Sequence, residues 1–458
     1  MSGPMALEPG GTERDTLALR LADDRTLALR MPDRGVDPDA VDLLAAELAD
    51  RVGPAVHPYE VAALLESEGL TGEVIQERYG HPDLFSLASA LYERVPRTYP
   101  EPAPPPDPWR PDHLRCALRG ALFALPGLAY LLTGRLWHAE RDTDVLIAAG
   151  LASWAWGQAL GHRAFLRMTT GRREAGRTLL KGAPLGAVVA TAAGSLFAGS
   201  ATAAGVAAAQ SVYLAAAGVL LVLAGERLLL AALVPVIAGA AALPWWEPGT
   251  ALRAALPLLS LAGAVAAAAW MLRSALAASP VPGGARPPVL RSLPYGLFGL
   301  AAGVLVLVEG HRHPYAVIVL TVSMGPAEWL LYKYRGMSVA ALRAVTTPAA
   351  FLLRSAGVLA LCLLAYLLPL LPAARLTDSA PVPLMLLAAA LWTALLLQAF
   401  GMAWPPAAVC LTAAAGSAAA TVLHRPPGDT AASLCCGAAA LCLAVCALRL
   451  LGRPAAHA

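Results

Sequence analysis

Few ionisable residues of this 458-residue chain lie inside its long apolar stretches, and Glu328 is the first that could do chemistry. It stands in the segment SMGPAEWLLYKYR, two residues after Pro326, which can interrupt the hydrogen bonds of a helix. Arg354 lies at a similar depth in the next apolar stretch. Charges in an apolar stretch are costly and mark ion or substrate pathways. We predict a Glu328–Arg354 ion pair; the alternative is that Arg354 reaches the membrane surface while Glu328 meets Lys333 or water.

A second group of polar and aromatic side chains lies in the apolar segment SWAWGQALGHR. Trp154 and Gln158 are four residues apart, so they share one face of a helix. Facing a central cavity they would contact a substrate; aromatic packing within the protein is the alternative. The residues proposed for a substrate or ion pathway are Glu328, Arg354, Trp154, Trp156, Gln158 and Trp329. Glu226 and Glu309 stand at the ends of apolar stretches, where we expect solvated anchors.

Motifs of soluble enzymes are missing from the sequence. There is no Walker A segment, GxGxxG turn, HExxH or GxSxG, so an ATPase or hydrolase has no support. The HRH triplet at 311–313 lacks a third metal ligand, and the seven cysteines form no CxxC pair, so we expect small buried thiols. The sequence therefore predicts no cofactor, no metal and no catalytic residue, and it favours a role other than catalysis.

Composition shows which elements must position these residues. The chain is 57% hydrophobic and only 14% charged, and its mean hydropathy is +0.59, which excludes an ordinary soluble globule. Twelve apolar stretches have about the length of a membrane-spanning helix. They cover residues 113–133, 143–163, 179–199, 203–224, 227–246, 252–273, 291–310, 314–334, 346–370, 381–400, 403–423 and 431–451. We predict an all-α polytopic membrane protein of about twelve spans, with ten or eleven as alternatives.

Charge is sorted along the chain and across the membrane. Residues 1–111 hold 20 acidic and 10 basic residues, whereas residues 112–458 hold 11 and 24. With twelve spans and both termini in the cytoplasm, 18 basic residues fall on the cytoplasmic side and six on the outside, as the positive-inside rule requires. Only two of the 34 basic residues are lysines, which is typical of high-GC bacteria. We therefore predict a multi-pass protein of the bacterial cytoplasmic membrane.

Residues 1–97 form an acidic region that we predict to be a small cytoplasmic domain. Alternating leucines over 15–31 predict a β-hairpin, and apolar periodicity predicts short helices over 39–52 and 57–70 and two more after Thr71 and His81. The charge of −10 over residues 1–111 opposes nucleic-acid binding. A cytoplasmic protein is the alternative partner, and a scaffold docked on the membrane part is the simpler role. A proline-rich linker follows at 98–111.

The membrane part contains a weak internal repeat. The linker 279–290 separates a first half, 112–278, from a second, 291–458, with six predicted spans in each. At an offset of 176 residues, Arg115, Gly120 and Gly134 coincide with Arg291, Gly296 and Gly310. Two six-span halves are the plan of many transporters.

The span count and the Arg/Gly starts of spans one and seven resemble the multidrug/oligosaccharidyl-lipid/polysaccharide exporter superfamily, particularly its twelve-span polysaccharide-export branch. The resemblance covers about residues 112–452, and the acidic N-terminal domain lies outside that family's usual plan. It implies two lobes around a cavity near the bilayer midplane, alternating access, and export of a polysaccharide, lipid-linked sugar or amphiphile, with Glu328 titrating or binding a cation.

Two other functions stay open at this stage. A polytopic glycosyltransferase using a lipid-linked donor would place acidic residues in its first outside loop, where this chain has Glu140, Asp142 and Asp144. The third reading is a membrane scaffold whose N-terminal domain recruits partners. An outward groove over Asp142 and Asp144 would favour the enzyme, and a cleft between the halves lined by spans one, two, seven and eight would favour transport. The sequence leaves the oligomeric state and the substrate open.

Overall fold

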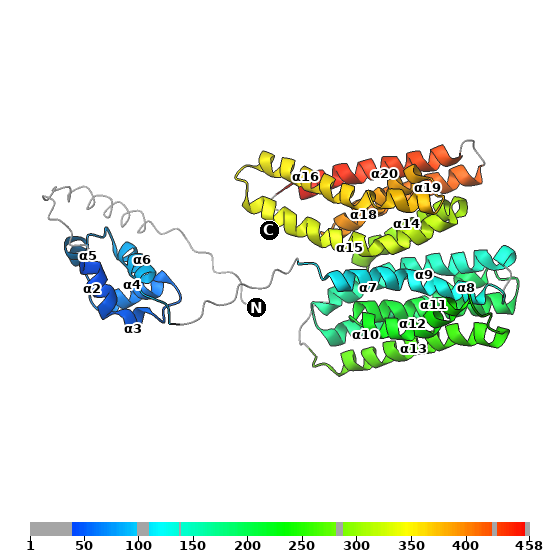
Figure 1. Cartoon of the computed structure of the whole chain (residues 1–458), viewed down its shortest axis with the longest axis horizontal. Coiled ribbons are helices and arrows are strands. Elements are labelled where there is room, and N and C mark those ends of the chain that lie inside the picture. Colours follow the sequence, from blue (N-terminus) through cyan, green and yellow to red (C-terminus); the bar gives the residue numbers. More distant parts are fainter. Residues whose placement is uncertain (1–38, 99–109, 137–138, 281–286, 424–427, 454–458) are drawn as a thin grey trace, which may run out of the picture. The chain divides into compact units, whose positions relative to one another are not determined.

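The computed structural model of the protein describes residues 39–98, 110–136, 139–280, 287–423 and 428–453 (Figure 1). Helices, with no strand among these residues, make up its regular structure. The chain divides into two compact units, Met1–Pro106 and Asp107–Ala458. The hairpin predicted over 15–31 lies outside the described residues.

The N-terminal unit consists of short helices in the predicted segments, although the helix predicted over 39–52 is divided into two at Leu48. They are α2 (Asp39–Glu47), α3 (Ala49–Val52), α4 (Pro58–Ser67), α5 (Gly72–Tyr79) and α6 (Leu84–Arg94). Gly80 ends α5 at a φ of 68°, a conformation that favours glycine. Asp83 caps α6 by accepting a hydrogen bond from the Ser86 amide at 2.7 Å. Val61, Leu65 and Leu87 are fully buried in the shared core.

The second unit contains a helix, or a pair of helical segments, at each of the twelve predicted spans. The first half holds α7 (His113–Ala124), η1 (Leu125–Gly127), α8 (Leu128–Thr133), α9 (Ala139–Met168), α10 (Arg172–Ser195), α11 (Ala201–Val222), α12 (Glu226–Ala242) and α13 (Thr250–Ala277). The second holds η2 (Val289–Ser292), α14 (Leu293–Arg312), α15 (Pro314–Arg343), α16 (Pro348–Leu367), α17 (Leu370–Leu376), α18 (Pro381–Ala399), α19 (Trp404–Val422) and α20 (Gly428–Leu451).

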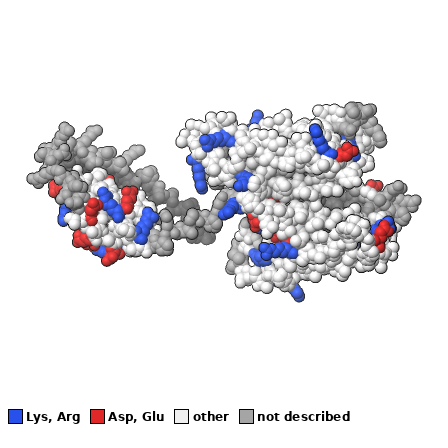
Figure 2. Space-filling model, viewed as in Figure 1, with Lys and Arg blue, Asp and Glu red and all other residues white. Residues whose placement is uncertain are grey.

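The lengths and composition of these helices fit a membrane protein. Within the described residues, nine helical segments are long and apolar enough to cross a membrane; α9, α10 and α12 are not among them. Among the three helices that are not included, α12 has only 17 residues and α10 begins with a charged first turn. Figure 2 shows that, on the face drawn, charged side chains of this unit gather at its two ends and leave an uncharged band between them. The chain is thus an all-α polytopic membrane protein.

The helices of the two halves follow the repeat offset of 176 residues. Moved by this offset, the first residue of α10, Arg172, falls on Pro348, the first residue of α16. The neighbours repeat as well: α9 packs on α10 as α15 packs on α16, α12 on α13 as α19 on α20, and α11 on α13 as α18 on α20. The two halves therefore share these helix pairs, although α11 packs extensively on α9 and α10 while its equivalent α18 contacts α15 and α16 far less.

Each half has its own apolar core. The first buries Leu179, Leu220 and Leu229, and the second is centred on Trp392, which donates its indole N–H to the Ala327 carbonyl at 3.2 Å. The expectation of buried thiols is met by four cysteines, whereas Cys442 is exposed and two others are half-buried. The helices at which the halves meet also belong to these cores, as Leu122 of α7 and Leu330 of α15 show.

Candidate functional site

Two helix pairs make the main contacts between the halves among the described residues, and η2 also packs on α9. Helix α7 packs on α15, and α9 packs on α14; we call these the α7–α15 seam and the α9–α14 seam. In span order, the first seam pairs spans one and eight and the second pairs spans two and seven. Exchange of the two halves turns one pairing into the other. The four spans expected to line a cleft between the halves are therefore the ones that pack together there.

Glycines let the backbones approach closely at the α7–α15 seam. A Cβ atom added to Gly120 would lie 2.9 Å from the backbone nitrogen of Gly325, and one added to Gly325 would lie 2.8 Å from the carbonyl oxygen of Cys116. Real Cβ contacts are longer, so any side chain at these positions would push the helices apart. Small residues at crossing points are how helices pack tightly in a membrane, where lipid removes the usual hydrophobic gain.

The α9–α14 seam uses the same device over a longer stretch. A Cβ on Gly296 would lie 3.1 Å from the Ala155 carbonyl oxygen, and one on Gly299 would lie 2.9 Å from Cγ of Gln158. Gly296 is the residue that the repeat offset matches to Gly120. The two equivalent glycines thus both allow close helix packing, one at each seam. The sequence repeat that relates them is weak.

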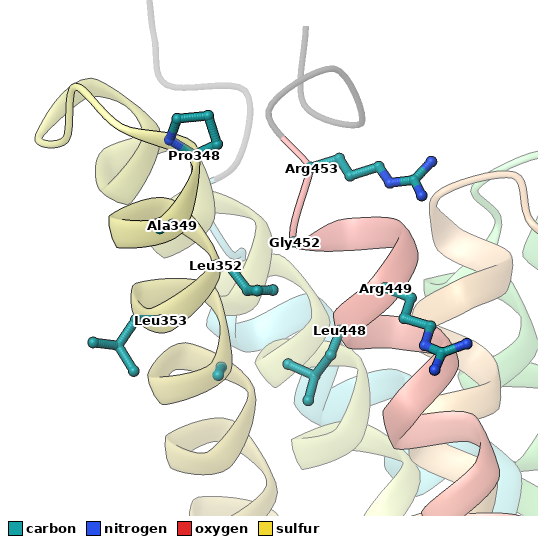
Figure 3. A pocket seen from close by; sticks show the side chains of 9 residues that line it. Pro348, Ala349, Leu352, Leu353, Leu448, Arg449, Gly452 and Arg453 are labelled. Carbon is teal, nitrogen blue, oxygen red and sulfur yellow. The ribbon is translucent and has the colours of Figure 1, made fainter.

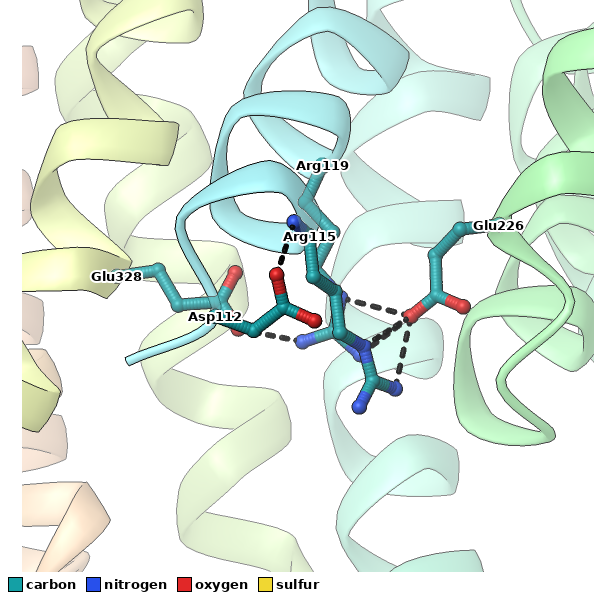
Figure 4. Close-up of polar contacts among 5 residues, drawn as sticks. All are labelled: Asp112, Arg115, Arg119, Glu226 and Glu328. Carbon is teal, nitrogen blue, oxygen red and sulfur yellow. Dashed lines mark hydrogen bonds and ion pairs between the residues drawn. The ribbon is translucent and has the colours of Figure 1, made fainter. Parts of the chain in front are cut away.

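A chain of charges crosses from one half to the other beside Gly120. Arg119 on α7 donates from Nη1 to Oε1 of Glu328 on α15 at 2.6 Å, and its Nη2 lies 3.0 Å from Oε1 of Glu226 on α12. Figure 4 shows Arg119 between the two carboxylates, with Glu328 on the α15 side and Glu226 on the α12 side. Arg119 and Glu328 side chains are each 23% exposed. Arg119 is therefore shared between its own half and the opposite one.

The carboxylate of Glu226 is the most deeply buried member, with 7% of its side chain exposed. A second arginine, Arg115, donates from Nε to the same Oε1 atom at 2.9 Å. Arg115 and Arg119 are one helical turn apart, and Asp112 caps the start of their helix by accepting from the Arg115 amide at 3.0 Å. Glu226 is also the first residue of α12, where the helix dipole favours a negative charge. Two guanidinium groups and a helix terminus therefore compensate one carboxylate.

An aromatic contact accompanies the ion pair across the same seam. Trp329 on α15 donates its indole N–H to Nδ1 of His113 on α7 at 2.9 Å. The ammonium of Lys333 lies 5.4 Å from the Trp329 ring centroid, in cation–π range. Glu328 and Trp329 are adjacent in sequence, and both bind α7. The α7–α15 seam is thus closed by polar contacts from two successive residues.

The α9–α14 seam closes with a different chemistry at its corresponding end. The ring of His162 stacks on Tyr295, with centroids 3.7 Å apart and an interplanar angle of 13°. Nδ1 of His162 lies 3.1 Å from the hydroxyl of Ser292. By the repeat offset, Tyr295 occupies the position of Arg119. Equivalent positions thus hold a charge at one seam and an aromatic ring at the other.

The predicted Glu328–Arg354 pair is wrong. Glu328 pairs with Arg119, and Arg354 has an exposed side chain on α16. Helices α7 and α16 both pack on α15, but the Glu328 side chain points toward α7. Hydropathy placed both charges at similar depth without indicating which helix each would face. Arg354 therefore lies apart from the charge network.

The aromatic and amide candidates divide between two environments. Trp154 and Gln158 share one face of α9, as predicted, and that face meets α14: a Cβ on Gly303 would lie 3.5 Å from the Trp154 ring. Trp156 turns the other way and donates its indole N–H to the Gly182 carbonyl at 2.8 Å, within the first half. Trp329 stands at the α7–α15 seam. Four of the six candidates, Glu328, Trp154, Gln158 and Trp329, therefore lie where the halves meet.

Sequence reasoning missed the residues that complete the network. Arg119 was predicted only as a cytoplasmic charge, and Arg115 as a cytoplasmic charge and a marker of the repeat. Glu226 was expected to be a solvated anchor, which its burial contradicts. Glu309 is likewise buried, at 5% exposure. The available signal was the four-residue spacing of the two arginines, which places both on one face of the first span, and the lone carboxylate at the start of the fifth.

The acidic residues weighed for a glycosyltransferase belong to a helix. Asp142 and Asp144 lie within the first turns of α9, and Asp142 is buried. A pocket among the described residues lies between α16 and α20. Its lining residues form neither the outward groove expected of the enzyme nor the cleft between the halves expected of a transporter.

Comparisons with known proteins give structural similarity alone. No protein-family description matches the sequence, and no curated protein does. Among solved structures, the chain is similar to a MATE transporter, ClbM, in complex with Rb⁺ (TM-score 0.41, 15% identity, 74% of this chain and 94% of that one). It is also similar to a MATE protein in a bent conformation (TM-score 0.40, 15% identity, 74% and 95%). A third is an outward-facing multidrug resistance MATE family transporter of the MOP superfamily (TM-score 0.39, 15% identity, 74% and 95%). At these scores the function must be argued from the chain's own residues.

Proposed function

We propose that the chain is a secondary transporter that works by alternating access, with its two six-helix halves moving against each other. The observation that carries the proposal is the ion pair between Arg119 of the first half and Glu328 of the second, 2.6 Å apart at a glycine-lined seam. Charged groups at membrane depth are costly unless they serve a pathway or a switch. An ion pair between the two structural repeats lies where a switch that controls their relative movement would have to be.

Arg119 has two carboxylate partners, one in its own half and one in the other. When the α7–α15 seam opens, Arg119 keeps Glu226, because both belong to the first half and lie 3.0 Å apart. Only Glu328 loses its guanidinium partner. The freed carboxylate then binds a proton, a metal cation or a cationic group of the cargo, and closing the seam releases it in favour of Arg119. The network thereby couples the position of the halves to occupancy of Glu328.

The orientation follows from the sorting of basic residues. The starts of α7 and α14 and the ends of α9 and α13 belong to the side that carries most of the arginines, which the positive-inside rule assigns to the cytoplasm. On this assignment the charge network closes the cytoplasmic side, and the N-terminal unit lies in the cytoplasm of a bacterium, where it is available to a protein partner. The cargo that we propose is an amphiphile, with a lipid-linked sugar or polysaccharide as the class that the resemblance to the exporter superfamily implies.

Transport by reconstituted protein tests the proposal. Proteoliposomes would carry an imposed proton or Na⁺ gradient, with ethidium as an amphiphilic cation and a fluorescent polyprenyl-linked sugar as the two probes. The wild type is expected to move at least one of them, and Glu328→Gln to slow it by about tenfold or more, as loss of one 1.4 kcal/mol charge interaction would. The matched control is Glu247→Gln, which removes an exposed carboxylate from an ion pair within the first half. Equal transport by wild type and Glu328→Gln would remove Glu328 from the mechanism.

A further inference from the structure

A groove of about 760 Å³ opens between the start of α16 and the end of α20. Leu352 and Leu353 line it from α16, and Leu448 lines it from α20. Figure 3 shows Leu352 and Leu448 between the two helices, with Arg449 and Arg453 extending from the C-terminal end of α20 and the turn that follows it. The groove is therefore apolar along its length and basic at one end.

The first half has no such groove at the equivalent place. Helices α10 and α13, which the repeat offset matches to α16 and α20, pack directly: a Cβ on Gly176 would lie 3.1 Å from Cβ of Ala275. The offset places Leu352 at the position of Gly176 and Arg449 at that of Arg273. A large side chain replaces the glycine that lets the helices meet. The groove is thus a departure of the second half from the shared plan.

The two basic residues are available to a ligand. Arg449 and Arg453 are four residues apart, both are exposed, and none of the ion pairs among the described residues involves them. None of the residues lining the groove is acidic. Guanidinium groups bind phosphate oxygens in paired hydrogen bonds. An uncompensated pair of them beside an apolar groove calls for a ligand with a phosphate and a hydrocarbon chain.

The position of the groove fits such a ligand in the bilayer. Leu353, 76% exposed, and Leu352, 46% exposed, lie on the membrane-facing side of α16. Pro348 begins α16 and α20 ends at Leu451, so the basic end of the groove lies where the helices leave the apolar layer. Phosphate groups of lipids occupy this level, and their acyl chains extend from it toward the midplane.

We propose that this groove binds an anionic phospholipid, with one acyl chain against Leu352 and Leu448 and the phosphate on Arg449 and Arg453. The lipid fills the space that Gly176 and Ala275 close in the first half, and so completes the packing of α16 on α20. The site is independent of the transport proposed above, because neither Glu328 nor Arg119 contributes to it.

Lipid-dependent stability tests the site in the purified full-length protein in a neutral detergent. The thermal midpoint is measured with phosphatidylglycerol, with phosphatidylcholine, or with inorganic phosphate. We expect phosphatidylglycerol alone to raise the midpoint, because a ligand that binds only the folded state stabilises it. The double variant Arg449→Gln/Arg453→Gln is expected to weaken the apparent affinity for phosphatidylglycerol about 30-fold. Each arginine contributes about 1 kcal/mol of attraction to an anionic lipid surface, and the variant removes two.

Two further variants keep the test decisive. Arg273→Gln, at the repeat-equivalent position of the half without a groove, should retain the full phosphatidylglycerol effect. Ala356→Trp should fill the groove from α16 and abolish the effect while leaving both arginines in place. Equal stabilisation by the two lipids, equal loss in Arg273→Gln, or stabilisation by inorganic phosphate alone would each overturn the lipid site. A dimer that forms through this face in the absence of lipid would overturn it as well.

Discussion

The two seams between the halves have equivalent positions in the repeat but different chemistry. At the α7–α15 seam, Arg119 binds Glu328 and Trp329 binds His113. At the α9–α14 seam, His162 stacks on Tyr295. Gly120 and Gly296 allow a close backbone approach in both, and the approach at Gly120 is the tighter one. The shared feature is steric, whereas the feature that differs is whether the contact can be changed by a proton or a cation.

This difference assigns the seams different parts in the proposed mechanism. An ion pair can be exchanged for another ionic partner at little cost, so the α7–α15 seam is suited to opening. Stacked rings and close contacts at glycines stabilise a helix pair through shape complementarity, and no ligand can take the place of either partner. The α9–α14 seam is therefore suited to be the pivot. The following substitutions test this division, beginning with the largest expected effect.

Arg119→Ala should destabilise the protein most. It removes the guanidinium partner of Glu328 and one of the two arginines that compensate the almost fully buried Glu226, which keeps Arg115. Removing one member of a buried pair costs about 3–5 kcal/mol, and partial exposure reduces the expected loss here to about 2–3 kcal/mol. Thermal unfolding in detergent measures it.

Adding Glu328→Gln to this variant supplies the control. If an unpaired charge causes the loss, the double variant should recover part of it, because one stranded carboxylate becomes neutral. A double variant less stable than Arg119→Ala would show that Glu328 contributes through packing.

Gly120→Ala and Gly296→Ala should both destabilise, by about 1–3 kcal/mol, since overpacking displaces the backbone. Gly120 should suffer more, because its new Cβ meets the rigid backbone of Gly325 at 2.9 Å. The control is Gly218→Ala in α11, where nothing lies within 4 Å. Alanine there should be neutral or stabilising by up to about 1 kcal/mol through helix propensity. Equal thermal midpoints for all three variants would contradict close packing at the seams.

His162→Ala should cost about 1–2 kcal/mol, from the stacked ring and the contact with Ser292. Unlike the arginine variant, it leaves no charge stranded. Transport assays separate the seams further: His162→Phe, which keeps a ring against Tyr295, should retain transport, whereas Glu328→Gln should not. Loss of transport in both would make the aromatic seam part of the switch.

Glu247→Gln should have the smallest effect. Arg135 binds Glu247 through two hydrogen bonds of 2.8 and 2.9 Å, and these lower the pKa of the Glu247 carboxyl. A lowered pKa contributes stability at neutral pH that is lost as the pH falls through it. Both side chains are 65% exposed, however, so solvent screens the pair. We expect no measurable change in thermal midpoint at pH 7 and the same acid stability as the wild type.

Much of the fold could be predicted because its signals are local. Length and apolarity placed the helices of the membrane unit, and glycines and capping residues placed those of the N-terminal unit, as Gly80 and Asp83 show. The repeat was visible in Gly120 and Gly296 because both must be small for the same reason. Each of these features depends on a residue and its near neighbours in the chain.

The partner of Glu328 depends on the tertiary structure. Arg119 is 209 residues away in sequence, and Arg354 is far closer. Apolar periodicity gives the depth of a charge in the membrane but not the direction in which it points, since a span apolar on all sides has no preferred face. The sequence alone determined that a carboxylate would stand within the membrane domain. Only the packing of α7 on α15 decided that this carboxylate would join the two halves, because that packing brings the side chains of Arg119 and Glu328 within hydrogen-bond distance.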